Sequence, residues 1–199
     1  MLLLKKLKFT GLGVICLALS ACLVPEKFTA SYSFKPTGEY TYRYDGTARD
    51  AMTLMMQADA KQKNRPVPEK EMQGLRVEMQ KLSKEPNVSN FKDLGNATYQ
   101  LVYEKDFKIG QRQDVLPIAQ ISKDKFGVYT VNATPFKPKD AEQFKLLGVK
   151  LDGVVEVRLP SNAKVISHDA TDAPGFFSKA YSWRMNLERQ KMEIKFTLS

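Results

Sequence analysis

A chain of 199 residues, 43% of them hydrophobic, is long enough to bury the core of one ordinary domain. One histidine and two cysteines argue against a zinc site, because such a site takes three or four ligands of these types. The formal charge of +9 comes from lysines and arginines spread along the chain, which indicates a solubilising exterior or contact with an anionic surface.

The first residues have the layout of an export signal. Lys5, Lys6 and Lys8 precede an apolar stretch over residues 9–19. That stretch is too short to span a bilayer, which needs about 20 apolar residues. A basic start followed by a short apolar core and small residues is typical of a secretory signal.

The end of this signal resembles the lipobox of bacterial lipoproteins. The sequence reads Leu19-Ser20-Ala21-Cys22, with an apolar residue and two small residues before a cysteine. In a lipobox the cysteine thiol takes the diacylglycerol, and small neighbours admit the signal peptidase. We therefore expect residues 1–21 to be a lipoprotein signal peptide, cleavage between Ala21 and Cys22, and lipidation of Cys22. The alternatives are an ordinary signal peptide with a chance cysteine and an uncleaved amphipathic anchor.

Removal of residues 1–21 leaves 178 residues and, since three lysines leave with the signal, a charge of +6. Cys16 also leaves and Cys22 is acylated, with palmitate for example, so we expect a mature domain without disulfides. Leu23 follows Cys22, where Asp resembles an inner-membrane retention signal. Its absence predicts a lipid-anchored protein of the outer membrane that faces the periplasm. Residues 22–27 are expected to form a lipidated tether to a single domain over residues 28–199.

The domain opens with two alternating runs. Phe28, Ala30, Tyr32 and Phe34 share one face of a predicted strand. The turn at 36–39 leads to a second run, in which tyrosines alternate up to Gly46. This pattern predicts a β-hairpin.

A helical hairpin is expected next, over about 47–85. Thr47 is the predicted cap of its first helix, and the second begins at Pro68-Glu69. We expect the helices to cover one face of a sheet, with their methionines in the core. The alternative is that these methionines form an adaptable binding surface.

The rest of the chain is predicted to be mostly strand, with one short helix near 140–147. The expected strands lie at 99–103, 117–121, 127–131, 154–159, 165–168, 179–187 and 192–198. Strands before and after one helical hairpin predict an α+β domain with a mostly antiparallel sheet, the two-helix hairpin being inserted after the first β-hairpin.

The turn between the helices is the one candidate binding patch. It groups four basic side chains, those of Lys61, Lys63, Arg65 and Lys70. They suit lipid headgroups or an acidic partner. The alternative is a solvated loop.

No pattern of residues indicates catalysis. Ser167, His168 and Asp169 are neighbours in a predicted strand, where successive side chains point to opposite faces. No Gly-rich phosphate loop and no calcium loop is present. We expect no catalytic residue, no cofactor and no metal.

The end of the chain resembles the LppM-type domain of envelope lipoproteins. The shared features are a strand ending in Leu159-Pro160, the strand Lys164-Val165-Ile166 leading to a loop, and a strand that contains Trp183. The opening hairpin through Tyr40–Gly46 fits the same plan. The resemblance implies an α+β lipoprotein domain that binds lipid or another envelope component.

These features together predict a membrane-anchored, non-enzymatic envelope lipoprotein that binds a lipid or protein component of the cell envelope. Anionic lipid or an envelope protein is the expected partner, and nucleic acid is not. One alternative is an immunity protein or an accessory lipoprotein of a secretion or assembly system. Another is a hydrolase with an unrecognised site.

Overall fold

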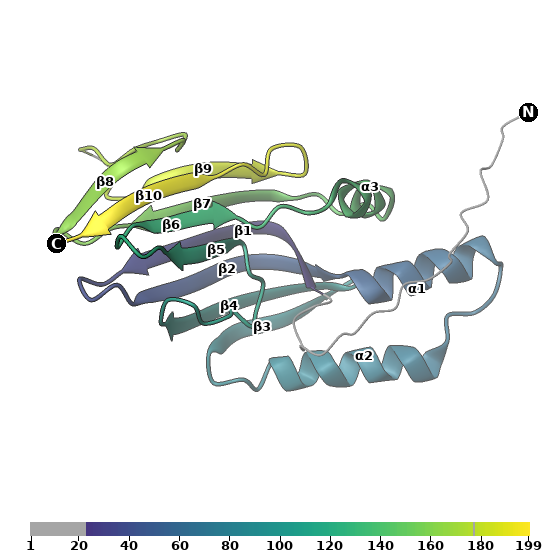
Figure 1. The fold of residues 1–199 in the computed structure, drawn as a ribbon. Coiled ribbons are helices and arrows are strands. Elements are labelled where there is room, and N and C mark those ends of the chain that lie inside the picture. The colour runs from purple at the N-terminus through teal and green to yellow at the C-terminus, as the bar shows by residue number, and fades with distance from the viewer. Residues whose placement is uncertain (1–22, 177) are drawn as a thin grey trace, which may run out of the picture.

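The computed structural model describes residues 23–176 and 178–199 (Figure 1). The expected signal peptide, Ala21 and Cys22 lie outside these residues, so their cleavage and lipidation stay predictions.

Two β-sheets and three helices make up the described fold. The six-stranded sheet has the order β3 (Val88–Gly95), β4 (Thr98–Phe107), β2 (Tyr40–Asp50), β1 (Leu23–Phe34), β7 (Asp152–Arg158) and β9 (Tyr181–Asn186). The four-stranded sheet has the order β5 (Ala119–Lys123), β6 (Tyr129–Ala133), β10 (Glu193–Leu198) and β8 (Ala163–His168). The helices are α1 (Ala51–Gln62), α2 (Glu69–Leu82) and α3 (Pro138–Leu146).

The predicted fold class is confirmed. Neighbouring strands run antiparallel except β1 and β7, which pair in parallel from Lys27 opposite Asp152 onward. The helical pair follows the first β-hairpin, β1–β2, as expected.

The core lies between the two sheets. Phe28, Ala30, Tyr32 and Phe34 are buried on one face of β1, as their alternation predicts. The two sheets meet in an aromatic cluster, where the ring of Phe196 in β10 packs edge-on to Phe34, at 4.9 Å, and stacks on Tyr129, at 5.2 Å.

Residues 108–118 cross the buried face as an irregular segment, which we call the 108–118 connector. Buried tyrosine hydroxyls of the first hairpin hold it. Tyr42 donates to the Leu116 carbonyl at 2.5 Å, and the Ala119 amide just beyond the connector donates to Tyr32 Oη at 2.9 Å. The buried Leu116 carbonyl and Ala119 amide therefore each find a hydrogen-bond partner away from water.

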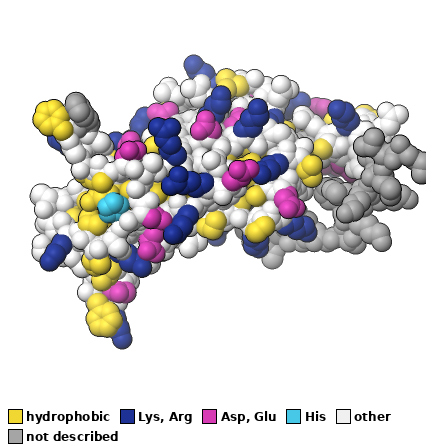
Figure 2. All heavy atoms as spheres, turned by 90° about the horizontal axis from the view of Figure 1, so that it is seen from above, with side chains coloured by type: hydrophobic (Ala, Val, Ile, Leu, Met, Phe, Trp, Pro, Cys, Tyr) yellow, Lys and Arg dark blue, Asp and Glu magenta, His cyan; other side chains and the backbone are white. Residues whose placement is uncertain are grey.

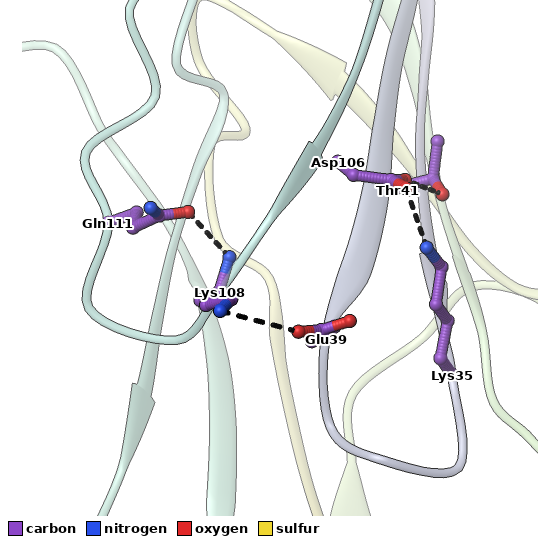
Figure 3. Close-up of polar contacts among 6 residues, drawn as sticks. All are labelled: Lys35, Glu39, Thr41, Asp106, Lys108 and Gln111. Atoms are coloured by element: carbon purple, nitrogen blue, oxygen red, sulfur yellow. Dashed lines mark hydrogen bonds and ion pairs between the residues drawn. The ribbon is translucent and has the colours of Figure 1, made fainter.

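The start of the connector is tied to the β1–β2 turn (Figure 3). Lys35 Nζ and Thr41 Oγ1 donate to the Asp106 carboxylate at 2.6 and 2.5 Å, and Lys108 lies 4.0 Å from the Glu39 carboxylate. These contacts lie at the end of the sheets opposite to the start of β1 (Figure 1).

The expectation that the helices cover a sheet face is wrong. In Figure 1, α1 continues beyond the end of β2 and α2 runs back towards the sheets, so most of the hairpin projects past the strands. Only the end of α2 joins the main core, through Met79 and Leu82. The four-stranded sheet and the connector already occupy the apolar face that the helices were expected to cover.

The burial of the methionine side chains follows from this arrangement of the helices. Met79 is buried, whereas Met52, Met55, Met56 and Met72 are half-exposed. Assigning all of them to the core was therefore wrong, because the helices that carry them project away from it.

The start of α1 also differs from the prediction. Thr47 belongs to β2, and the helix begins four residues later with Asp50 as its cap. The Asp50 carboxylate accepts hydrogen bonds from the Met52 and Thr53 amides at 3.0 and 3.2 Å. A capping residue satisfies amides that have no partner inside the helix.

The expected tether over residues 22–27 is corrected from Leu23 onward. Leu23–Lys27 are part of β1, and Leu23 pairs with Asp50 of β2. Leu23 and Val24 are buried, which explains why this stretch folds with the domain.

Candidate functional site

An apolar pocket opens at the end of the sheets where β1 begins. We call it the Leu23 pocket. Its walls come from five stretches of chain, namely Leu23, Pro25 and Phe28 of β1, residues 116–118, residues 134–136, Leu151 before β7, and Met185 with Gln190 around the β9–β10 turn. Segments far apart in sequence therefore converge beside the first described residue.

The β1 side of the pocket depends on a close approach of strands. Phe28 lies opposite Gly153 of β7, and its ring occupies the space that a Cβ at Gly153 would take. A second glycine, Gly46, lets β2 approach the backbone at Phe28 from the other side. Gly153 thus leaves room for the Phe28 ring in the wall of the pocket, and Gly46 leaves room for the backbone that carries it.

Leu116 gives the opposite wall an unusual backbone. Its φ of +46° lies in the left-handed region, which costs a residue other than glycine about 1–2 kcal/mol. The side chain is 2% exposed, and its carbonyl accepts the Tyr42 hydrogen bond. Burial raises the pKa of the Tyr42 hydroxyl well above its usual range, so this donor keeps its proton.

The pocket contains few polar groups. The Gln190 side chain is engaged at both ends, since its oxygen accepts from the Phe136 amide at 2.6 Å and its nitrogen donates to the Leu187 carbonyl at 2.9 Å. The Thr134 hydroxyl is buried and has no hydrogen-bond partner among residues 23–176 and 178–199. The pocket therefore offers an apolar lining and one uncommitted hydroxyl.

The pocket is small. Its volume is about 220 Å³. Pockets that take a whole drug-sized ligand measure roughly 300–1,000 Å³. This size suits one apolar side chain or part of an alkyl chain.

The predicted basic patch lies at the projecting tip of the α1–α2 hairpin. Asp59 pairs with two of its members, Lys63 at 2.7 Å and Arg65 at 2.5 Å. Hydrogen bonds from these two cations lower the pKa of the Asp59 carboxyl. Lys61 and Lys70 are exposed and form no ion pair within the described chain.

Charges are mixed on the face of the molecule seen from above in Figure 2. Figure 2 shows basic and acidic side chains interspersed over one face, with the histidine at the surface beside hydrophobic side chains. That mixture agrees with lysines that solubilise the domain and leaves the hairpin tip as the basic cluster that extends furthest from the sheets.

The Ser167-His168-Asp169 run does not form a triad. The Asp169 carboxylate accepts from the Trp183 indole at 2.9 Å and from the Glu193 amide at 2.7 Å, while the His168 ring lies against Tyr181. Burial alone would raise the pKa of Asp169, but these donors and Lys191 hold it below its usual value. Asp169 thus anchors the β9 and β10 strands.

At the other end of the molecule, Phe126 stands 77% exposed in the β5–β6 turn. The Asp124 carboxylate fixes this turn by accepting from the Phe126 and Val128 amides at 2.8 and 2.9 Å. Ile166 on the edge strand β8 is also exposed.

Within residues 23–176 and 178–199, no helix is long and apolar enough to cross a bilayer. The same residues contain no group of three or more histidine, cysteine or acidic side chains arranged to hold a metal ion.

The sequence matches no protein-family model and no curated protein. The resemblance to the LppM-type domain therefore stays a prediction.

Sequence reasoning missed the Leu23 pocket. Its lining is scattered over five stretches, and no periodicity connects them. The available signal is a repeated pattern, since Leu116-Pro117-Ile118 and Thr134-Pro135-Phe136 both place a proline directly before an apolar residue outside the strands.

Proposed function

We propose that this chain is a lipid-anchored, non-enzymatic lipoprotein of the outer membrane, whose periplasm-facing domain rests on the membrane and binds an envelope component. The anchor is Cys22, and its supporting evidence is the lipobox ending at Ala21-Cys22. Leu23 supports a location in the outer membrane, because Asp at this position would resemble an inner-membrane retention signal.

The observation that carries the proposal is the start of β1 at Leu23. Leu23 pairs with Asp50, and α1 begins at Ala51. A lipid on Cys22 would therefore lie at the base of the α1–α2 hairpin with no linker between membrane and domain.

The hairpin then has to lie along the membrane. α1 has 12 residues, which at 1.5 Å per residue makes it about 18 Å long. If it stood upright on the bilayer, it would lift Cys22 far above the headgroups. A hairpin lying on the surface brings Lys61 and Lys70 to anionic headgroups, each contributing about 1 kcal/mol to binding.

A substitution at the anchor tests this function in cells. Cys22→Ser is expected to leave the protein without acyl chains and with its signal uncut by the lipoprotein peptidase, because both steps require the Cys22 thiol. Cys16→Ser is the matched control, since it removes a thiol from the expected signal and should leave anchoring unchanged. Normal membrane association of the Cys22→Ser protein, with an unchanged mature mass, would contradict the proposal.

A second candidate is an immunity protein or an accessory lipoprotein of a secretion or assembly system. The exposed Phe126, held by Asp124 on a rigid turn, favours a protein partner at the end away from the anchor. Co-expression with a toxin or secretion protein encoded beside the gene tests it. Phe126→Ser should then abolish protection or assembly without changing stability, and full retention of either would count against this candidate.

A further inference from the structure

We propose that the Leu23 pocket holds part of an acyl chain carried by Cys22 of the same molecule. This inference rests on the proposed function, because it requires Cys22 to be acylated. An acyl chain bound in the pocket would hold the domain to its own membrane anchor.

The pocket begins directly after the expected acylation site in the chain. Leu23, Pro25 and Phe28 form the β1 side of the pocket, and Cys22 is the residue directly before Leu23. Acyl chains attached to Cys22 therefore start one residue from the wall. An attached group reaches the pocket at a high effective concentration, whereas a free lipid has to be captured from the membrane.

The chemistry of the pocket lining suits an acyl chain. The aliphatic and aromatic walls match an alkyl chain, and none of the described residues that line the pocket carries a charged side chain. The Thr134 hydroxyl lacks a partner in the described chain, and a hydroxyl can donate to the ester or amide carbonyl at the head of an acyl chain. A charged or strongly polar ligand would find no such match.

The volume of the pocket suits a segment of one acyl chain. At about 30 Å³ for a group as large as water, 220 Å³ accommodates roughly seven methylene groups. That is a segment of one acyl chain, and the remaining chains stay in the bilayer. Moving methylenes between bilayer and pocket exchanges one apolar environment for another, so the transfer carries no large hydrophobic penalty.

The pocket is also preformed. Its 116–118 wall is fixed by the Tyr42 and Tyr32 hydrogen bonds, at 2.5 and 2.9 Å, and includes the left-handed backbone at Leu116. Backbone in such a conformation persists only where its surroundings enforce it, and it gathers at binding sites. A wall held open in this way spares the acyl chain the cost of opening a closed core.

Photo-crosslinking of the full chain purified from membranes tests the proposal. A photoreactive benzoylphenylalanine replaces Met185, which lines the pocket, or Arg184, its exposed neighbour on the opposite face of β9. The same group at Ile118 serves as a second pocket position if the Met185 variant does not fold. Peptide mass spectrometry then identifies what each position has captured.

The expected result is a link, within one chain, between position 185 or 118 and an acyl chain on the Cys22 peptide, with loss of that link at position 184. Capture of phospholipid at the pocket positions, in acylated and Cys22→Ser protein alike, would overturn the assignment in favour of a lipid from the membrane. Acylated Cys22 with no lipid captured at either position would overturn it and leave the proposed function standing. An unmodified Cys22 would overturn both.

Discussion

The Tyr42 hydroxyl shows how much one buried hydrogen bond can decide. It is the partner of the Leu116 carbonyl, and both groups are shielded from water. Tyr42→Phe leaves that carbonyl unsatisfied, which should lower the free energy of unfolding by about 1–3 kcal/mol. Urea denaturation followed by the fluorescence of Trp183, the one tryptophan, measures the change.

Tyr181→Phe is the control for this substitution, because Tyr181 lies near the surface against His168. It should change stability by no more than about 0.5 kcal/mol. Equal stability of the Tyr42→Phe and wild-type proteins would show that the connector is not held in this way.

Asp169 gives the fold a dependence on pH. Its pKa is lowered in the folded protein, so its contribution to stability is complete above the usual Asp value of about 4 and is lost as pH falls through the lowered pKa. Asp169→Asn should flatten the decline of stability below about pH 4, by at most ~1.4 kcal/mol per pH unit.

Thermal unfolding from pH 5 to pH 2 tests this dependence. The control is Asp152→Asn at an exposed position of β7. Parallel curves for the Asp169→Asn and wild-type proteins would contradict the role given to this carboxylate.

The backbone conformation of Leu116 could not be predicted from the sequence. Leu116 precedes a proline, and such residues favour extended backbone. Its left-handed φ arises from contacts with Tyr42 and the sheet, which local sequence does not contain.

Among the elements, those with a strict period were predictable. The alternating residues of β1, β2 and the C-terminal strands lie in the predicted strands, and both helices of the hairpin exist. β3 was missed because its pairing with β4 is irregular and Asn90 has a φ of +52°. A strand with shifts in register shows no clean alternation.

The cap of α1 is a property of the element that can be tested. Asp50 is fully buried and accepts from two amides and from the Thr53 hydroxyl at 2.6 Å. Asp50→Ala should lower the free energy of unfolding by about 1–2 kcal/mol, whereas Asp50→Asn should retain most of the cap. Circular dichroism during urea denaturation distinguishes the two variants, and equal losses would contradict the cap.

The projecting hairpin predicts how the domain binds membranes. The Lys61→Ala, Lys70→Ala double variant, in mature protein carrying Cys22→Ser, should bind phosphatidylglycerol vesicles about 2 kcal/mol more weakly. A matched change at Lys123, the last residue of β5, and Lys125, in the β5–β6 turn, should have little effect. Vesicle flotation measures both, and equal losses would point to charge alone rather than to the hairpin.

At the scale of the whole molecule, composition and order of elements predicted the fold class but not the packing. The expected arrangement placed the helices on the sheet, whereas a second sheet and the 108–118 connector lie there. Which element covers a face depends on long-range geometry. For the same reason the Leu23 pocket, assembled from five stretches, was beyond the reach of sequence patterns.

The arrangement places the expected anchor, the pocket and the base of the projecting hairpin at one end of the sheets. Leu23 connects them, because it lines the pocket, pairs with the last residue before α1 and follows Cys22. The chemistry of Cys22 therefore decides whether the domain is anchored as proposed.

The intact mass of the protein purified from bacterial membranes tests that chemistry most directly. We predict a chain that begins at Cys22 and carries the mass of a diacylglycerol, with or without a third acyl group. A chain of unmodified mass, or one that still contains residues 1–21, would contradict it.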